Sequence, residues 1–124
     1  MLFFQNLPFL GLLSLLLATS PFTSASVPED VIGLWRGNES ILWIERVGTT
    51  LEAVIIAFRP TELVYLEGEQ APWPIGTPRR DDLNPDPKLR ARYLMGLNML
   101  ADYRFDQGHW QGKIYDPRSG NIYS

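Results

Sequence analysis

The sequence predicts a mainly β protein: a small antiparallel sheet with one short helix, preceded by a signal-peptide helix. Three observations favour this fold class. From residue 31 onwards, apolar and polar residues alternate with the two-residue period of a half-buried strand. Six prolines lie from residue 60 to residue 87, a density that neither a central strand nor a long helix tolerates. An apolar run over residues 7–18 precedes all of these features.

Residues 1–26 are interpreted as a signal peptide, and residues 27–124 as a single β-rich domain. Small and hydroxyl-bearing residues follow the apolar run, as a signal peptidase requires. No Lys or Arg precedes the run, so the terminal amine is its only positive charge. An uncleaved anchor and a buried apolar helix remain alternatives, although two prolines and several polar residues disfavour an anchor. We therefore expect an exported protein, periplasmic or secreted, without a permanent membrane span.

The composition indicates a folded domain and excludes several classes of function. The chain is 45% hydrophobic and 12% aromatic, which is not typical of disorder. It contains no cysteine, so disulfides, thiolate metal sites, a cysteine nucleophile and a lipidated cysteine are excluded. The net charge is −3 and the basic residues are scattered, so nucleic acid is not an expected partner. Stability must then come from apolar burial.

Residues 41–58 predict a β-hairpin. Over residues 41–47 the odd-numbered side chains share one face and the even-numbered ones share the other. Gly48 begins a short turn, and residues 51–58 are rich in β-branched side chains.

The segment from residue 60 to residue 87 predicts a long ordered loop or lid, with one short strand over residues 61–67. A short helix is expected to follow, with Asp86 as its N-cap, Pro87 at its first position and Gly96 near its end. Three leucines should pack this helix onto the sheet: Leu94, Leu97 and Leu100.

The last third of the chain predicts two strands and the beginning of a third. Residues 103–105 and 110–115 read as strands on either side of a turn at residues 107–108. After a further turn at residues 116–120, residues 121–124 begin another strand.

No catalytic constellation is recognisable, so the chain is not expected to be an enzyme and no cofactor is predicted. The single histidine, His109, lies beside a predicted turn, and one His without Cys cannot form a zinc site. A hydrolase using pairs of aspartates remains a less favoured hypothesis, since separation in space is not visible in a sequence. Its candidate residues are Asp81, Asp82, Asp86, Asp106 and Asp116.

A calcium loop is an alternative for residues 82–86, which match the first three ligand positions of an EF-hand. Pro87 occupies the position that requires Gly, and Tyr93 the position that requires a bidentate Glu. Capping and turn formation account for these residues without a metal, so no metal site is predicted.

Three parts of the chain carry a family resemblance. Gly33 and Trp35 form the G-x-W pattern that begins the first strand of lipocalins. With residues 82–90 (DLNPDPKLR), Gly96 and residues 110–123 (WQGKIYDPRSGNIY), the chain resembles the bacterial exported family catalogued as domain of unknown function 2147. The expected structural motif residues are Gly33, Trp35, Asn84, Asp86, Pro87, Asp116, Pro117 and Gly120.

The resemblance implies a lipocalin-like β-barrel that binds a small apolar ligand, and no activity or cofactor is established for the family. Two departures stand out. The family pattern has Gly-Gly where this chain has Gln111 and Gly112. It also continues past the position of Ser124 through one or two more strands, which end in a W-x-R motif. We therefore expect an open or incomplete barrel, apparently truncated, that is a fragment or self-associates through its open sheet edge.

The favoured hypothesis is a binding module of the cell envelope for a small apolar or amphipathic ligand. Trp43, Ile55 and Tyr115 are predicted to line the pocket under the proline-rich lid. Arg90 or Arg92 could pair with a ligand carboxylate at the mouth, with a solvated or salt-bridged surface arginine as the alternative. The competing hypothesis is a structural or protein-interaction domain of the envelope.

Overall fold

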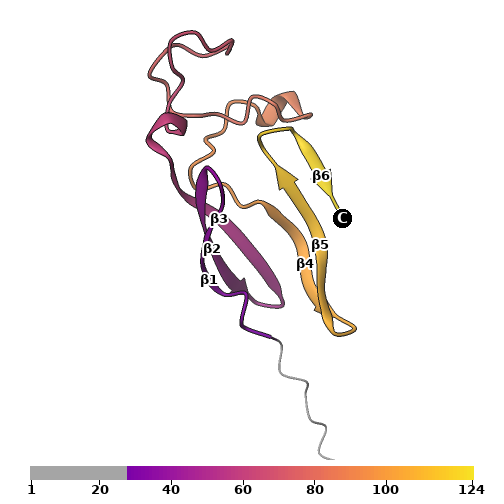
Figure 1. Cartoon of the computed structure of the whole chain (residues 1–124). Coiled ribbons are helices and arrows are strands. Elements are labelled where there is room, and N and C mark those ends of the chain that lie inside the picture. Colours follow the sequence, from indigo (N-terminus) through magenta and orange to yellow (C-terminus); the bar gives the residue numbers. More distant parts are fainter. Residues whose placement is uncertain (1–27) are drawn as a thin grey trace, which may run out of the picture.

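The computed structural model describes residues 28–124, so the predicted signal peptide lies outside the described residues (Figure 1). Residues 28–124 form one antiparallel six-stranded sheet in which each strand lies beside its sequence neighbours. This confirms the prediction of a mainly β fold. The strands are β1 (Gly33–Arg36), β2 (Ser40–Val47), β3 (Thr50–Phe58), β4 (Leu100–Asp106), β5 (His109–Asp116) and β6 (Asn121–Tyr123). No helix in this range is long and apolar enough to cross a membrane.

The predicted hairpins form as β2–β3 and β4–β5. Gly48 turns the first at a positive φ of 63°, and Gly108 turns the second at 86°. Both conformations suit glycine because it lacks a Cβ atom. In β2–β3 a bulge shifts the register after Ile41, so Leu42 lies opposite Ile55 and Trp43 lies opposite Val54.

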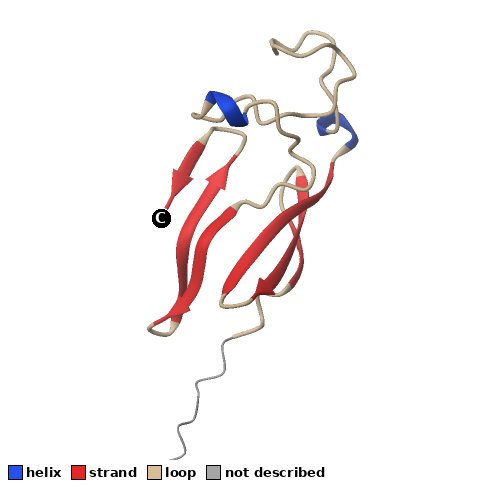
Figure 2. Cartoon of the chain, turned by 180° about the vertical axis from the view of Figure 1, so that it is seen from behind, coloured by secondary structure: helices blue, strands red, loops and turns tan. Residues whose placement is uncertain are grey.

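The sheet consists of two halves, β1–β3 and β4–β6, which meet where β3 lies beside β4 (Figures 1 and 2). Between the two strands the seam has one backbone pair, Thr50 with Arg104. The chain before β4 continues the contact with β3 through an isolated bridge of Val54 with Asn98 and through backbone hydrogen bonds that join residues 96–99 to Ala53 and Ile55. β1 and β6 are the outer strands, and within residues 28–124 they do not pair with each other.

The segment between β3 and β4 crosses one end of the sheet (Figure 2). It contains two single turns of 3₁₀ helix, η1 (Pro60–Glu62) and η2 (Pro87–Leu89). The predicted strand over residues 61–67 is wrong: η1 occupies its start, and beyond it only Val64 forms a bridge, to Pro78. Proline cannot donate a ladder hydrogen bond, which limits the pairing there.

The predicted short helix is also wrong in length, although its cap is correct. The Asp86 side chain accepts a hydrogen bond from Lys88 N at 3.0 Å, and Pro87 follows as the first helical residue. The helix ends after three residues because later backbone groups find distant partners. Leu94 N donates to Arg79 O, and Gly96 N donates to Ile55 O.

The core forms where this crossing segment meets the sheet. Ile55 of β3 is 2% exposed and packs with Leu94 and Leu97 of the segment. These leucines are therefore core residues, as expected, but from irregular chain and not from a helix. Four partly buried side chains complete the cluster: Leu42, Phe58, Met99 and Tyr115.

Candidate functional site

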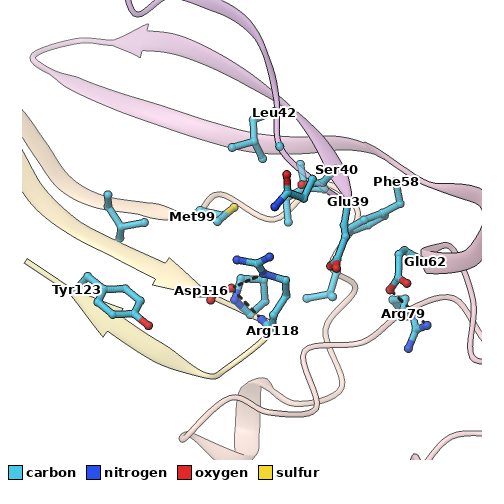
Figure 3. Close-up of a pocket in the computed structure, with 16 residues that line it drawn as sticks. Glu39, Ser40, Leu42, Phe58, Glu62, Arg79, Met99, Asp116, Arg118 and Tyr123 are labelled. Atoms are coloured by element: carbon cyan, nitrogen blue, oxygen red, sulfur yellow. Dashed lines mark hydrogen bonds and ion pairs between the residues drawn. The ribbon is translucent and has the colours of Figure 1, made fainter. Parts of the chain in front are cut away.

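A cavity of about 500 Å³ opens between the two halves of the sheet, at the end where the crossing segment lies (Figure 3). Its floor and walls are apolar and come from both halves: Leu42, Ile55, Phe58, Leu94, Met99, Ile114 and Tyr123. Its rim is charged: Glu39, Glu62, Arg79, Asp116 and Arg118. We call this space the rim cavity.

A second cavity of about 270 Å³ continues towards the opposite end of the sheet. It shares Leu42, Met99 and Ile114 with the rim cavity. Its other lining residues are apolar or aromatic: Val31, Trp35, Ile44, Leu51, Ala53, Leu100, Tyr103 and Trp110. The rim cavity and this second cavity together are called the apolar trough below.

Strand periodicity explains why the trough is apolar. The even-numbered residues of β2, Leu42 and Ile44, lie on the same face as the odd-numbered residues of β3, which include Leu51, Ala53 and Ile55. The three β3 side chains are each at most 3% exposed. One face of this hairpin is thus a continuous apolar wall.

Ion pairs organise the charged rim. Arg118 Nε lies 3.1 Å from Asp116 Oδ1, and the same oxygen accepts from Arg118 N at 3.0 Å. Burial opposes ionisation of Asp116, but the hydrogen bonds from Arg118 outweigh it, and the pKa of Asp116 is lowered. Arg79 lies between Glu62 at 3.5 Å and Glu69 at 2.5 Å.

The structure separates the three residues predicted to line one pocket. Ile55 lines the rim cavity, and Tyr115 packs against the Ile55 core while lining a neighbouring groove. Trp43 lies on the other face of β2, where it is 39% exposed and its Nε1 donates to Glu45 at 3.1 Å. The expectation that Trp43 and Ile55 share a face is therefore corrected.

Neither Arg90 nor Arg92 lines the rim cavity. Arg92 Nε lies 2.7 Å from Asp81 Oδ2, and Arg90 Nε donates to the Asn84 carbonyl at 2.7 Å. Both guanidiniums hold the crossing segment together, and Arg92 agrees with the salt-bridged alternative, whereas Arg90 bonds to the backbone. The arginines at the cavity are Arg79 and Arg118.

Asp81 is the centre of a buried polar cluster. Its carboxylate is fully buried and receives hydrogen bonds from Arg92, from Asn84 Nδ2 at 2.8 Å and from the Tyr115 hydroxyl. Burial and the bond to Asp81 raise the pKa of Tyr115. Asp81 is one of the candidate residues for a hydrolase in the sequence, where no local signal distinguishes it from its only partly buried neighbours.

The structural motif residues bring separate parts of the chain together. A Cβ atom on Gly120 would lie 2.1 Å from the Leu83 carbonyl oxygen, so the turn after β5 packs directly on the segment before η2. Asn84 Oδ1 accepts from Asp86 N at 2.9 Å in that segment. The remaining members lie at turns or at the cavities: Gly33 has a φ of 128°, Trp35 lines the second cavity, and Pro117 lines the rim cavity.

Four of the five aspartates considered for a hydrolase have structural roles: Asp81, Asp86, Asp106 and Asp116. Asp86 caps η2, and Asp106 Oδ2 accepts from Gln111 Nε2 at 3.0 Å. Asp81 and Asp116 hold the cluster and the turn described above. In the part of the chain that the structure describes, no group of three or more His, Asp or Glu side chains is arranged to hold a metal ion.

Comparisons with known proteins place the chain in a family. One similar solved structure is protein HP1028 from Helicobacter pylori, which is described as belonging to the lipocalin family. It is 23% identical over 73% of this chain, with a TM-score of 0.48. This chain spans 56% of the length of that protein. No curated protein matches the chain. The family described as "Uncharacterized protein conserved in bacteria (DUF2147)" matches residues 33–124, which confirms the resemblance, and the chain belongs to this family.

Proposed function

We propose that this protein is a binding module for a small apolar or amphipathic molecule, which lies in the apolar trough. One observation carries the proposal: two cavities that share three apolar side chains run between the halves of the sheet and end at a charged rim. Ligand pockets are typically about 300–1,000 Å³, apolar, with few polar groups. The rim cavity lies in this size range, the second cavity is apolar, and the charged groups are confined to the rim. A lipocalin-like mode of binding and an exported location, periplasmic or secreted, are parts of this proposal.

The proposed role is binding and not catalysis. The charged groups of the rim are largely paired with one another, as Arg118 is with Asp116 and Arg79 with Glu62. His109 begins β5 at the hairpin turn and does not line either cavity of the trough.

The test is ligand binding by the processed protein purified from its host. Native mass spectrometry and organic extraction should reveal a bound small molecule. Dodecanol added to the emptied protein should change the fluorescence of Trp35 and Trp110, which line the second cavity.

Two matched substitutions test whether the ligand binds in the apolar trough. Ile114→Trp places a large ring where the two cavities meet and should abolish dodecanol binding. Ile56→Trp, at a side chain that is 45% exposed and lines neither cavity, should leave binding unchanged. An empty extract together with no response to dodecanol would contradict the proposal.

A second candidate, a structural or protein-interaction domain, is favoured by the outer strand β6. Ile122 and Tyr123 on this strand are more than half exposed, and its outer edge is unpaired within the described range. Such edges accept further strands. Crosslinking followed by pull-down discriminates the two, because stoichiometric recovery of a partner with an empty trough favours the interaction domain.

A further inference from the structure

The charges at the rim cavity limit which charge the polar head group of a ligand can carry. Five charged residues line this cavity, and the carboxylates outnumber the guanidiniums: Glu39, Glu62 and Asp116 against Arg79 and Arg118. The apolar second cavity lies beyond them, so an amphipathic molecule would place its tail there and its head among these five groups.

Both guanidiniums are already neutralised by the protein. Arg79 is shared between Glu62 and Glu69, with Glu69 contacting both of its terminal nitrogens at 2.5 and 2.9 Å. Arg118 is held by Asp116, whose other oxygen accepts from Ser119 Oγ at 3.2 Å. An anionic head group would therefore have to displace a carboxylate that the protein supplies.

Glu39 is the exception at the rim. It lies in the turn between β1 and β2 and is partly buried. Among the described residues its carboxylate forms no ion pair within 4 Å and no hydrogen bond, although its charge is close enough to help Asp116 raise the pKa of Arg118. Figure 3 shows its carboxylate between the Arg118 and Arg79 ion pairs. Two further arginines, Arg36 and Arg59, line an adjoining groove that Glu39 also lines, and neither forms an ion pair with Glu39 among the described residues.

We propose that the trough selects a cationic amphiphile, an alkyl or aryl ammonium whose charged head binds the Glu39 carboxylate and whose tail fills the second cavity. This inference rests on the proposed function and names its ligand class. A cation gains a charge-assisted hydrogen bond to a partly desolvated carboxylate that accepts no hydrogen bond from the described residues. An anion meets a rim with more negative than positive groups.

Three probes with the same twelve-carbon chain test the charge preference of the full protein: dodecylammonium, dodecanol and dodecanoate, each titrated below its micelle concentration at neutral pH. We expect dodecylammonium to bind about tenfold more tightly than dodecanol, as one charge-assisted hydrogen bond allows. Dodecanoate should bind most weakly, and added salt should reduce the difference.

Glu39→Gln should remove the advantage of dodecylammonium over dodecanol. Because this side chain bonds to no described residue, the variant should fold normally, which its thermal melt verifies. Glu67→Gln, at an exposed residue outside both cavities, is the matched control and should keep the advantage.

Two outcomes distinguish a failure of the proposed ligand class from a failure of the proposed binding function. If dodecanol binds but dodecanoate equals or exceeds dodecylammonium, or if Glu39→Gln keeps the preference, the cationic ligand class is overturned while the binding module stands. If none of the three probes binds, the binding module and the ligand class fail together.

Discussion

The carboxylate of Asp81 ties the crossing segment to β5 through a single buried cluster. A buried charge is tolerated only when neighbours supply hydrogen bonds and an opposite charge. Arg92 supplies the charge from the same segment, and Tyr115 supplies a hydrogen bond from the sheet. The attachment of the crossing segment to the sheet therefore depends on a few individual side chains.

Tyr115 should make the stability of the protein sensitive to alkaline pH. Burial and the Asp81 carboxylate raise its pKa above the ordinary value of 10.0, so the folded state favours the protonated phenol. The stabilisation is complete below pH 10.0 and is lost as pH rises above it, because the unfolded chain ionises first. Urea denaturation at increasing pH should show this loss.

Tyr115→Phe provides the comparison. This variant should be less stable at neutral pH, and the difference from the native protein should narrow above about pH 10. Tyr65, whose pKa is also raised, is present in both proteins and its effect cancels. A constant difference across this range would contradict the assigned role of Tyr115.

Gly120 should tolerate no side chain. A Cβ atom would clash with the Leu83 carbonyl, and the φ of 73° adds the usual strain of a left-handed residue. Gly108, with a φ of 86° and nothing within 4 Å of a Cβ atom, shares the strain without the clash. Gly108→Ala should therefore cost about 1–2 kcal/mol, and Gly120→Ala clearly more, by chemical denaturation. Equal losses would mean that the contact with Leu83 is unimportant.

Among neighbouring strands, β3 and β4 share the fewest backbone pairs at their junction, a single one between Thr50 and Arg104. β4 bulges between Ala101 and Arg104, with Asp102 at a positive φ of 51°. Gly112 of β5 faces this bulge, and a Cβ atom there would lie 2.6 Å from Tyr103 Cα. Such a bulge bends its strand and increases the local twist, and Gly112 leaves room for it.

Asn98 should be essential to this junction. Its Oδ1 accepts from Ala53 N at 2.9 Å and from Leu100 N at 3.1 Å, which links β3 to the start of β4. Asn98→Ala leaves two backbone donors without their acceptor and should destabilise the protein by about 2–4 kcal/mol. Asn98→Asp retains the acceptor oxygen and should lose less. If both variants melt alike, the side-chain bridge is not what joins the halves.

At the scale of the whole molecule, one small core joins elements that are distant in the sequence. Ile55 of β3 contacts leucines about forty positions later, and Tyr115 closes the cluster from β5. With no disulfide available, this cluster and the buried Asp81 network connect the crossing segment to both halves of the sheet.

Ile55→Ala should therefore destabilise the entire domain, by about 2–5 kcal/mol. The adjacent Ile56→Ala removes the same atoms from a side chain that is 45% exposed, and should cost far less. Thermal melts followed by circular dichroism compare the two variants. Similar melting temperatures would show that the structure has no shared core at Ile55.

The sequence by itself determined the local features: the alternation of the β2–β3 hairpin, the turn glycines, the Asp86 cap and the motifs that identify the family. These depend on neighbours within a few positions, where strand period and capping rules apply directly. Tertiary structure alone decided which face of β2 lines the cavities. Leu42 lies on that face, and Trp43 lies on the opposite one. Tertiary structure also shortened the helix at η2 and paired Arg92 with Asp81, because those backbone and side-chain partners come from distant parts of the chain. Alternation defines two faces of a strand, but only packing against distant elements determines which face is buried.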